Sequence, residues 1–134
     1  MDGFNDGFKL YIKGGSAEVI EIQSSEVSDY METTRQLMKA KPKTDAIIFS
    51  EDYIAIAGLH VLYELGIPVP GQVAVVGMNN SRYAQISNPA LTSIDNMLYD
   101  TSLIAVRNLL DVLNGERVNH KMSIGSDLVE RSST

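Results

Sequence analysis

The chain has 134 residues, of which 44% are hydrophobic and 21% are charged, and its net charge at pH 7 is −6. This length predicts one domain or a large piece of one, and the absence of cysteine excludes disulfides and cysteine-ligated metals. The acidic balance argues against direct contact with a nucleic-acid backbone. No apolar run is long enough to span a membrane, and residues 1–11 lack the pattern of a signal peptide. We therefore expect a cytoplasmic protein without a membrane partner.

The first third of the chain predicts a helix, a strand and a second helix. Apolar side chains recur at helical spacing over residues 4–12, and the Gly14–Gly15 pair ends this pattern. Residues 17–22 (AEVIEI) are predicted to form a strand. Ser28 is the expected N-cap of a helix that ends before Pro42. The expected inner stripe of this helix consists of Met31, Thr34 and Met38.

Two continuous apolar runs, residues 46–50 and 73–77, flank a predicted helix over residues 53–65. Strands that are apolar on both faces are typical of parallel sheets with helices on each side. The alternation of strands and helices predicts an α/β fold, with a parallel sheet, helices on both faces and right-handed crossovers. The sequence then predicts an extended piece at 91–94, a helix from Leu98 to Val112 and a last strand over 122–128.

The helix over residues 53–65 is apolar around most of its circumference. One explanation is packing beneath neighbouring helices. The other is contact with a partner chain, to which Ala55, Ala57 and Gly58 would allow close approach. We favour the second explanation.

Polar side chains follow both apolar runs where each predicted strand ends. Glu51 and Asp52 follow the first run, and Asn79 and Asn80 follow the second. In open α/β sheets, ligands bind at the carboxyl ends of the strands. We therefore expect Glu51 and Asn79 to bind a ligand, because a carboxylate and an amide together can accept from and donate to hydroxyl groups. Asp52 is expected instead to cap the helix that follows it.

Known catalytic patterns do not occur in this sequence. It has no Walker motif, no GxGxxG and no GxSxG, and His60 and His120 are too few to indicate a metal site or a triad. The Glu51–Asp52 pair could bind Mg²⁺ as in a receiver domain, but the other positions of such a site are not in place. We expect no enzyme, no cofactor and no metal.

Several segments resemble the lactose-repressor/galactose-repressor (LacI/GalR) family of bacterial transcription regulators. They are TDAIIFSEDYIAIAGLHVLYELGIPVPGQVAVVGMNN, NPALTSIDN, LLDVLNGE and LVERSST. MDGFNDGF is also similar to the R-x-x-G-F segment of the family, although its arginine would precede Met1. The resemblance covers essentially the whole chain. It implies one subdomain of a periplasmic-binding-protein-like type I fold, from the carboxyl-terminal part of the effector-binding domain.

The resemblance also implies how the 134 residues divide. Residues 1–95 and 122–134 would belong mainly to the second subdomain, and residues 96–121 would pack against a first subdomain that is absent from this chain. DNA contact would come only from an absent N-terminal domain. The apolar stripe of the helix within 96–121 would then lack its cover, so we expect repacking or a dimer to hide it.

Site residues are implied in the same way. Glu51, Met78 and Asn79 occupy positions that usually contact the effector, which is a sugar or a related small molecule in the family. The homodimer interface would be formed by the helix over 53–65 and the segment after Asn80, with Ala55, Ile56, Leu59 and Ser87 as its expected residues.

The implied function is the effector-sensing and dimerising core of a LacI-like regulator. Effector binding would close a cleft and shift the paired DNA-binding domains. Two alternatives from other classes are a solute-binding protein of a sugar transport system, which shares the fold, and an enzyme on a flavodoxin-like sheet.

Overall fold

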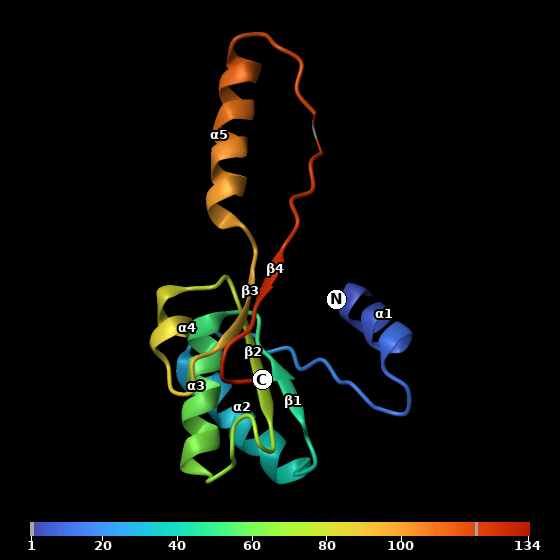
Figure 1. The fold of residues 1–134 in the computed structure, drawn as a ribbon, viewed down its shortest axis with the longest axis vertical. Coiled ribbons are helices and arrows are strands. Elements are labelled where there is room, and N and C mark those ends of the chain that lie inside the picture. Colours follow the sequence, from blue (N-terminus) through green and yellow to red (C-terminus); the bar gives the residue numbers. More distant parts are fainter. Residues whose placement is uncertain (1, 120) are drawn as a thin grey trace.

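The computed structural model describes residues 2–119 and 121–134, and the predicted α/β class is confirmed (Figure 1). In chain order the elements are α1 (Asp2–Tyr11), α2 (Val27–Ala40), β1 (Ala46–Ile48), α3 (Asp52–Glu64), β2 (Ala74–Met78), α4 (Arg82–Ile86), β3 (Thr92–Asp95), α5 (Leu98–Leu113) and β4 (Asp127–Val129). His120, considered above for metal binding, lies outside the described residues.

The four strands form one sheet in the order β1-β2-β3-β4. β1, β2 and β3 are parallel, as predicted, and Ile47 of β1 lies opposite Val75 of β2. β4 runs antiparallel to β3, so the prediction of an all-parallel series is wrong for the last strand. The reason is that residues 114–119 and 121–126 return alongside α5 and approach the sheet at the edge where β3 ends (Figure 1). The chain then continues beside β2, where the Val75 amide donates to the Ser133 carbonyl at 2.8 Å.

α3 packs against one face of the sheet and supplies most of the core. Ile54, Ala55, Ala57, Leu59, Val61 and Leu62 are all buried. Gly58 lies against the ring of Phe49, and a Cβ at this glycine would come within 2.4 Å of that ring. The small residues of α3 therefore pack inside the chain. The predicted contact of Ala55, Ala57 and Gly58 with a partner chain is wrong. α2 and α4 also pack against α3.

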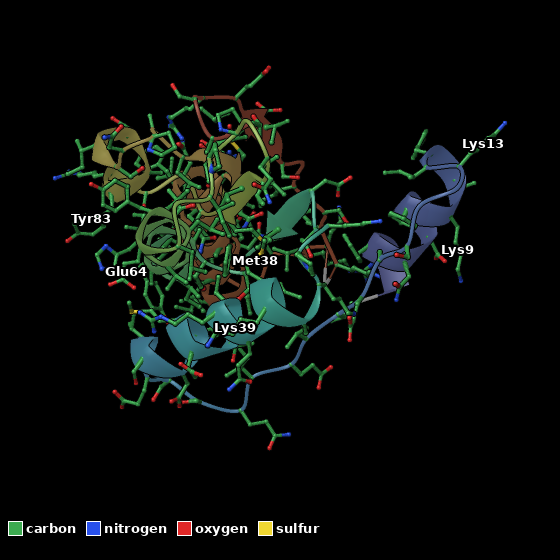
Figure 2. The ribbon with its side chains drawn as sticks, turned by 90° about the horizontal axis from the view of Figure 1, so that it is seen from below. Lys9, Lys13, Met38, Lys39, Glu64 and Tyr83 are labelled. Atoms are coloured by element: carbon green, nitrogen blue, oxygen red, sulfur yellow. The ribbon has the colours of Figure 1, made fainter. Side chains whose placement is uncertain are left out.

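α2 lies beside α3 and presents the predicted inner stripe. Thr34 and Met38 are buried, and Figure 2 shows Met38 on the side of α2 that faces the rest of the fold. The predicted N-cap, Ser28, is wrong, because the helix already begins at Val27. The amide of the true N-cap, Glu26, donates to the hydroxyl of Ser24 at 3.1 Å, so the polar start lies earlier in the chain.

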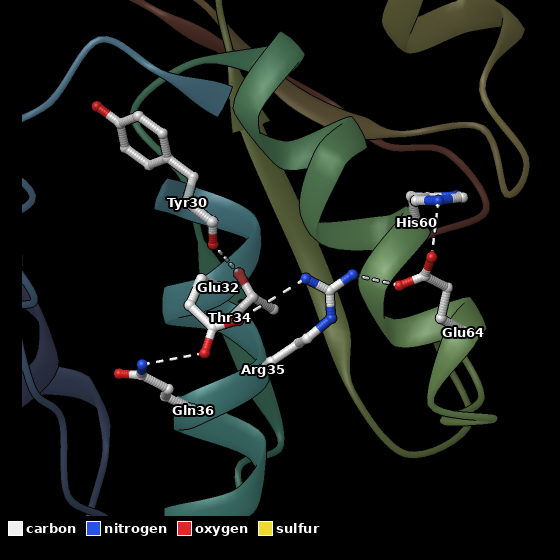
Figure 3. Close-up of polar contacts among 7 residues, drawn as sticks. All are labelled: Tyr30, Glu32, Thr34, Arg35, Gln36, His60 and Glu64. Atoms are coloured by element: carbon white, nitrogen blue, oxygen red, sulfur yellow. Dashed lines mark hydrogen bonds and ion pairs between the residues drawn. The ribbon is translucent and has the colours of Figure 1, made fainter. Parts of the chain in front are cut away.

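Polar contacts also join α2 to α3 at the surface (Figure 3). Arg35 of α2 donates to Glu64 of α3 at 2.5 Å, and His60 lies 3.2 Å from the same carboxylate. The Arg35 guanidinium holds the pKa of Glu64 below its ordinary value. Exposed ion pairs of this kind contribute little to stability, because solvent screens them. The two helices are therefore held together mainly by their buried side chains.

The predicted strand over residues 17–22 is wrong. This segment is extended but pairs with no strand, and it connects to α1, which lies beyond the β1 edge of the sheet (Figure 1). Its alternating side chains fit a strand, but a strand also needs a neighbour for its backbone hydrogen bonds. β1 is consequently an edge strand, and Ile48, on the face opposite α3, is 48% exposed.

α5 projects away from the sheet (Figure 1). We call α5 together with the returning residues 114–119 and 121–126 the arm. No side chain of α5 is buried, so the expected repacking of its apolar stripe is wrong for this structure. Its last residue, Leu113, is 72% exposed. No described helix, α5 included, is long and apolar enough to cross a membrane.

Two leucine-to-alanine variants test where the stability of the fold resides. Leu62 of α3 is fully buried, so Leu62→Ala should lower the free energy of unfolding by about 2–5 kcal/mol through the cavity it leaves. Leu113→Ala makes the same chemical change on the exposed arm and should alter stability by less than about 0.5 kcal/mol. Urea unfolding followed by circular dichroism measures both. Equal losses in the two variants would contradict this account of the core.

Candidate functional site

The carboxyl ends of β1, β2 and β3 meet at one edge of the sheet because these strands are parallel. The Asn79 side-chain amide donates to the Glu51 carboxylate at 2.6 Å, and the Asn96 amide donates to the Asn79 carbonyl oxygen at 2.8 Å. All three side chains are half-buried, so they form a connected polar group that solvent still reaches. We call Glu51, Asn79 and Asn96 the strand-end cluster. The structure thus brings Glu51 and Asn79 together, with half-buried Met78 next in the chain.

A tight turn follows β2 and contains both Asn79 and Asn80. Asn79 and Asn80 both adopt left-handed backbone conformations, with φ of 87° and 47°. Asparagine visits this region more readily than most residues. The backbone amide of Asn79 donates to the Ile94 carbonyl at 2.7 Å, and the backbone amide of Asn80 donates to the Ser93 hydroxyl at 3.0 Å. The turn is therefore fixed to β3.

Asp52 does not cap α3 as predicted. It is the first residue of the helix, whose N-cap is Glu51, and no side chain caps this end. Asp52 is only 2% exposed, and its carboxylate accepts from the Ser81 amide at 2.5 Å and the Ser93 hydroxyl at 2.6 Å. A buried carboxylate requires such partners, because leaving it without hydrogen bonds is costly. Asp52 therefore ties the start of α3 to α4 and β3, and so positions Glu51.

Gly77 makes room for this carboxylate. A Cβ at Gly77 would lie 2.3 Å from the Asp52 Oδ1 atom and 2.9 Å from a methyl group of Leu91. Any larger residue at position 77 would therefore displace the Asp52 carboxylate.

A second polar group lies beside the strand-end cluster. The Asn80 side-chain amide donates to Asp95 at 2.9 Å, and Arg131 donates to the Asn80 carbonyl oxygen at 2.5 Å. Asp95 also accepts from the Met97 amide at 2.8 Å. The hydrogen bond from Asn80, and then that from Met97, keep the pKa of Asp95 below its ordinary value.

The sequence patterns described above do not single out Asn96, Asp95 or Arg131. A signal for the first two exists, because Asp95–Asn96 follows the apolar piece LTSI as Asn79–Asn80 follows VAVVGM. The same rule for strand ends applies to both pairs. Arg131 carries no comparable signal, because its partner Asn80 is distant in sequence.

Two of the four expected dimer residues face inward. Ala55 is 0% exposed and Leu59 is buried, and both belong to the core, so their side chains cannot reach a partner chain. This corrects the prediction for both. Ile56 and Ser87 are half-buried. The exposed apolar residues on α3 and α4 are instead Tyr53, Tyr63, Tyr83 and Ile86.

The described part of the chain contains no group of three or more acidic or histidine side chains placed to hold a metal ion. The strand-end cluster offers one carboxylate and two amides. These groups can accept from and donate to hydroxyl groups, so the arrangement suits the binding of a polar small molecule.

Residues 11–134 match the sequence model of the periplasmic binding protein-like domain. The chain belongs to this family. An HTH-type transcriptional regulator of Lachnoclostridium phytofermentans is 30% identical to it over 116 residues, which cover 87% of this chain and 35% of that protein. A LacI-type transcription regulator from Bifidobacterium animalis subsp. lactis is 34% identical, with a TM-score of 0.73 over 80% of this chain and 39% of the other.

A third similarity concerns the fold alone. The structure of the regulator CelR in complex with cellobiose is 24% identical and gives a TM-score of 0.87 over 98% of this chain. The predicted resemblance to the effector-binding domain of LacI-type regulators is thus confirmed, and these relatives are named as regulators, not enzymes. The periplasmic-binding-protein-like chain spans well under half the length of each of them.

A glycine substitution tests the seat of Asp52. Gly77→Ala should lower the free energy of unfolding by about 1–3 kcal/mol, because the added methyl group overlaps the Asp52 carboxylate. Gly125→Ala is the matched control, since a Cβ there meets nothing within 4 Å. Urea unfolding of both variants measures the difference. An unchanged midpoint for Gly77→Ala would show that Asp52 moves aside without cost.

Proposed function

We propose that this chain is the effector-sensing part of a LacI-type transcription regulator. The observation that carries the proposal is the strand-end cluster, in which Glu51 and Asn79 share hydrogen bonds at the ligand-binding edge of a periplasmic-binding-protein-like sheet. The named relatives are regulators, which favours this function over a solute-binding protein of a transport system.

The chemistry of the cluster favours an effector rich in hydroxyl groups, such as a sugar. Glu51 would accept hydrogen bonds from the effector, while Asn79 and Asn96 would both accept and donate. In the structure these side chains bond to one another. An effector would exchange those bonds for its own, and Met78 would supply an apolar contact beside them.

We also propose the division of the chain that the resemblance implies. Residues 1–95 and 122–134 form most of one subdomain, and residues 96–121 pack on another subdomain of a longer protein. The exposed apolar face of α5 supports this division, because Tyr99, Leu103, Val106 and Leu110 line a hollow on it. Effector binding then closes the cleft between the subdomains. A DNA-binding domain elsewhere in that cytoplasmic protein responds to the closure.

Sugar binding can be tested on the 134-residue chain by NMR. Titration of the ¹⁵N-labelled chain with D-glucose, D-galactose and cellobiose should shift the amides of residues 51–52, 78–80 and 95–97. Glu51→Ala and Asn79→Ala should each weaken binding about 2- to 10-fold, the effect of one lost hydrogen bond. Glu32→Ala removes an exposed carboxylate on α2 and should leave binding unchanged. Equal affinities in all three variants, or no shift with any sugar, would contradict the proposed site.

The exposed faces of α3 and α4 are the proposed dimer surface. Tyr63 is 83% exposed on α3, and Tyr83 and Ile86 are exposed on the adjacent α4. Half-buried Ile56 and Ser87, both expected from the sequence, complete the surface. Pairing of this surface with its copy would remove these apolar side chains from water.

Light scattering of the 134-residue chain tests the dimer. The unchanged chain should have the mass of a dimer, and Ile86→Glu should reduce it to a monomer by placing a charge in the interface. Leu113→Glu introduces the same charge on the arm and should keep the dimer mass. A monomeric unchanged chain would contradict the proposal. Dissociation by Leu113→Glu alone would place the interface on the arm.

A further inference from the structure

We propose that Asn80 is a positioning residue that holds the arm in a fixed orientation relative to the proposed effector-binding edge. Asn80 neighbours Asn79 in the same turn, yet its side chain makes different contacts. Asn79 bonds to Glu51 and Asn96, whereas Asn80 bonds to Asp95 and Arg131. In this turn Asn79 belongs to the strand-end cluster, and Asn80 contacts the residues next to the arm.

The outgoing connection of the arm depends on Asp95. This residue ends β3, and one of its carboxylate oxygens accepts from the Asn80 amide while the other accepts from the Met97 amide. Met97 is the N-cap of α5 and adopts a left-handed conformation with φ of 49°. No side chain caps this helix end. The direction in which α5 leaves the sheet is therefore set by a backbone amide that Asp95 holds, and Asp95 is held by Asn80.

On the returning side of the arm, β4 pairs with β3, and Arg131 adds the contact with Asn80. Arg131 follows β4, and its guanidinium donates to the Asn80 carbonyl oxygen at 2.5 Å and to the Leu91 carbonyl at 2.7 Å. Its backbone amide donates to the Thr92 hydroxyl at 2.8 Å. Asn80 is therefore bonded on both sides of the arm, through its donor to Asp95 at the end of β3 and through its acceptor to Arg131 just after β4.

The lowered pKa of Asp95 is consistent with this arrangement, because Asn80 is its largest cause. The link to sensing rests on the proposed function. If an effector draws Asn79 away from Glu51 and Asn96, the adjacent Asn80 moves with the turn. The bonds to Asp95 and Arg131 then transmit that movement to the arm.

Distances between spin labels test the positioning role without any ligand. The chain has no cysteine, so Lys39→Cys on α2 and Arg107→Cys on α5 provide two specific labelling sites. Both residues are exposed, and dilution with unlabelled protein removes distances between copies. Asn80→Gly removes the side chain and tolerates the positive φ. It should broaden the distribution of distances between α2 and α5. Asn79→Gly is the matched control from the same turn and should broaden it less.

A conservative variant separates the two sides of Asn80. Asn80→Asp keeps an acceptor for Arg131 but faces Asp95 with a second carboxylate. It should broaden the distance distribution and raise the pKa of Asp95, which ¹³C NMR measures. Amide spectra of β1 to β3 report whether each variant is folded. Unchanged distances and an unchanged Asp95 pKa in folded Asn80 variants would overturn the proposal, as would equal broadening by Asn79→Gly. Neither result depends on sugar binding, so this test and that of the proposed function fail separately.

Discussion

The contact between the buried Asp52 carboxylate and the bare backbone of Gly77 organises the edge of the sheet at which the parallel strands end. This contact fixes the start of α3 against β2. The same carboxylate accepts hydrogen bonds from Ser81, which precedes α4, and from Ser93 of β3. Glu51 precedes Asp52 in the chain, so its position follows from this contact. The Asp52 carboxylate thereby joins α3 to three other elements, β2, α4 and β3.

Two polar groups share this edge, and they differ in purpose. The strand-end cluster is half-buried, and its members bond mainly to one another, which leaves them able to exchange partners. The group around Asn80 instead bonds to the segments that carry the arm. The two asparagines are neighbours in one turn that is fixed to β3. A displacement of one backbone should therefore also displace the other. The proposed effector contact and the proposed positioning of the arm thereby involve neighbouring residues of a single turn.

Sequence patterns predicted the features that depend on local order and missed those that depend on distant partners. The apolar runs located β1 and β2, and the parallel arrangement brought Glu51 and Asn79 to the same edge. The role of Asp52 was not predictable, because Ser81 and Ser93 lie far along the chain. A helix that is apolar around most of its circumference does not reveal which side faces its own sheet. The pattern therefore does not show that Ala55 is buried inside the chain, and the family resemblance does not show it for Leu59. Residues 17–22 carry a strand pattern, but a pattern does not supply a neighbouring strand.

The open side of β1 has a consequence for the chain in concentrated solution. Its outer backbone groups have no partner strand in the sheet, and the half-exposed Ile48 lies on the same short element. Such a border can accept an extended segment from another molecule, and residues 17–22 have the alternating composition to serve as one. Each copy thus carries both an open strand edge and an alternating segment, the two features that strand addition between identical chains would need.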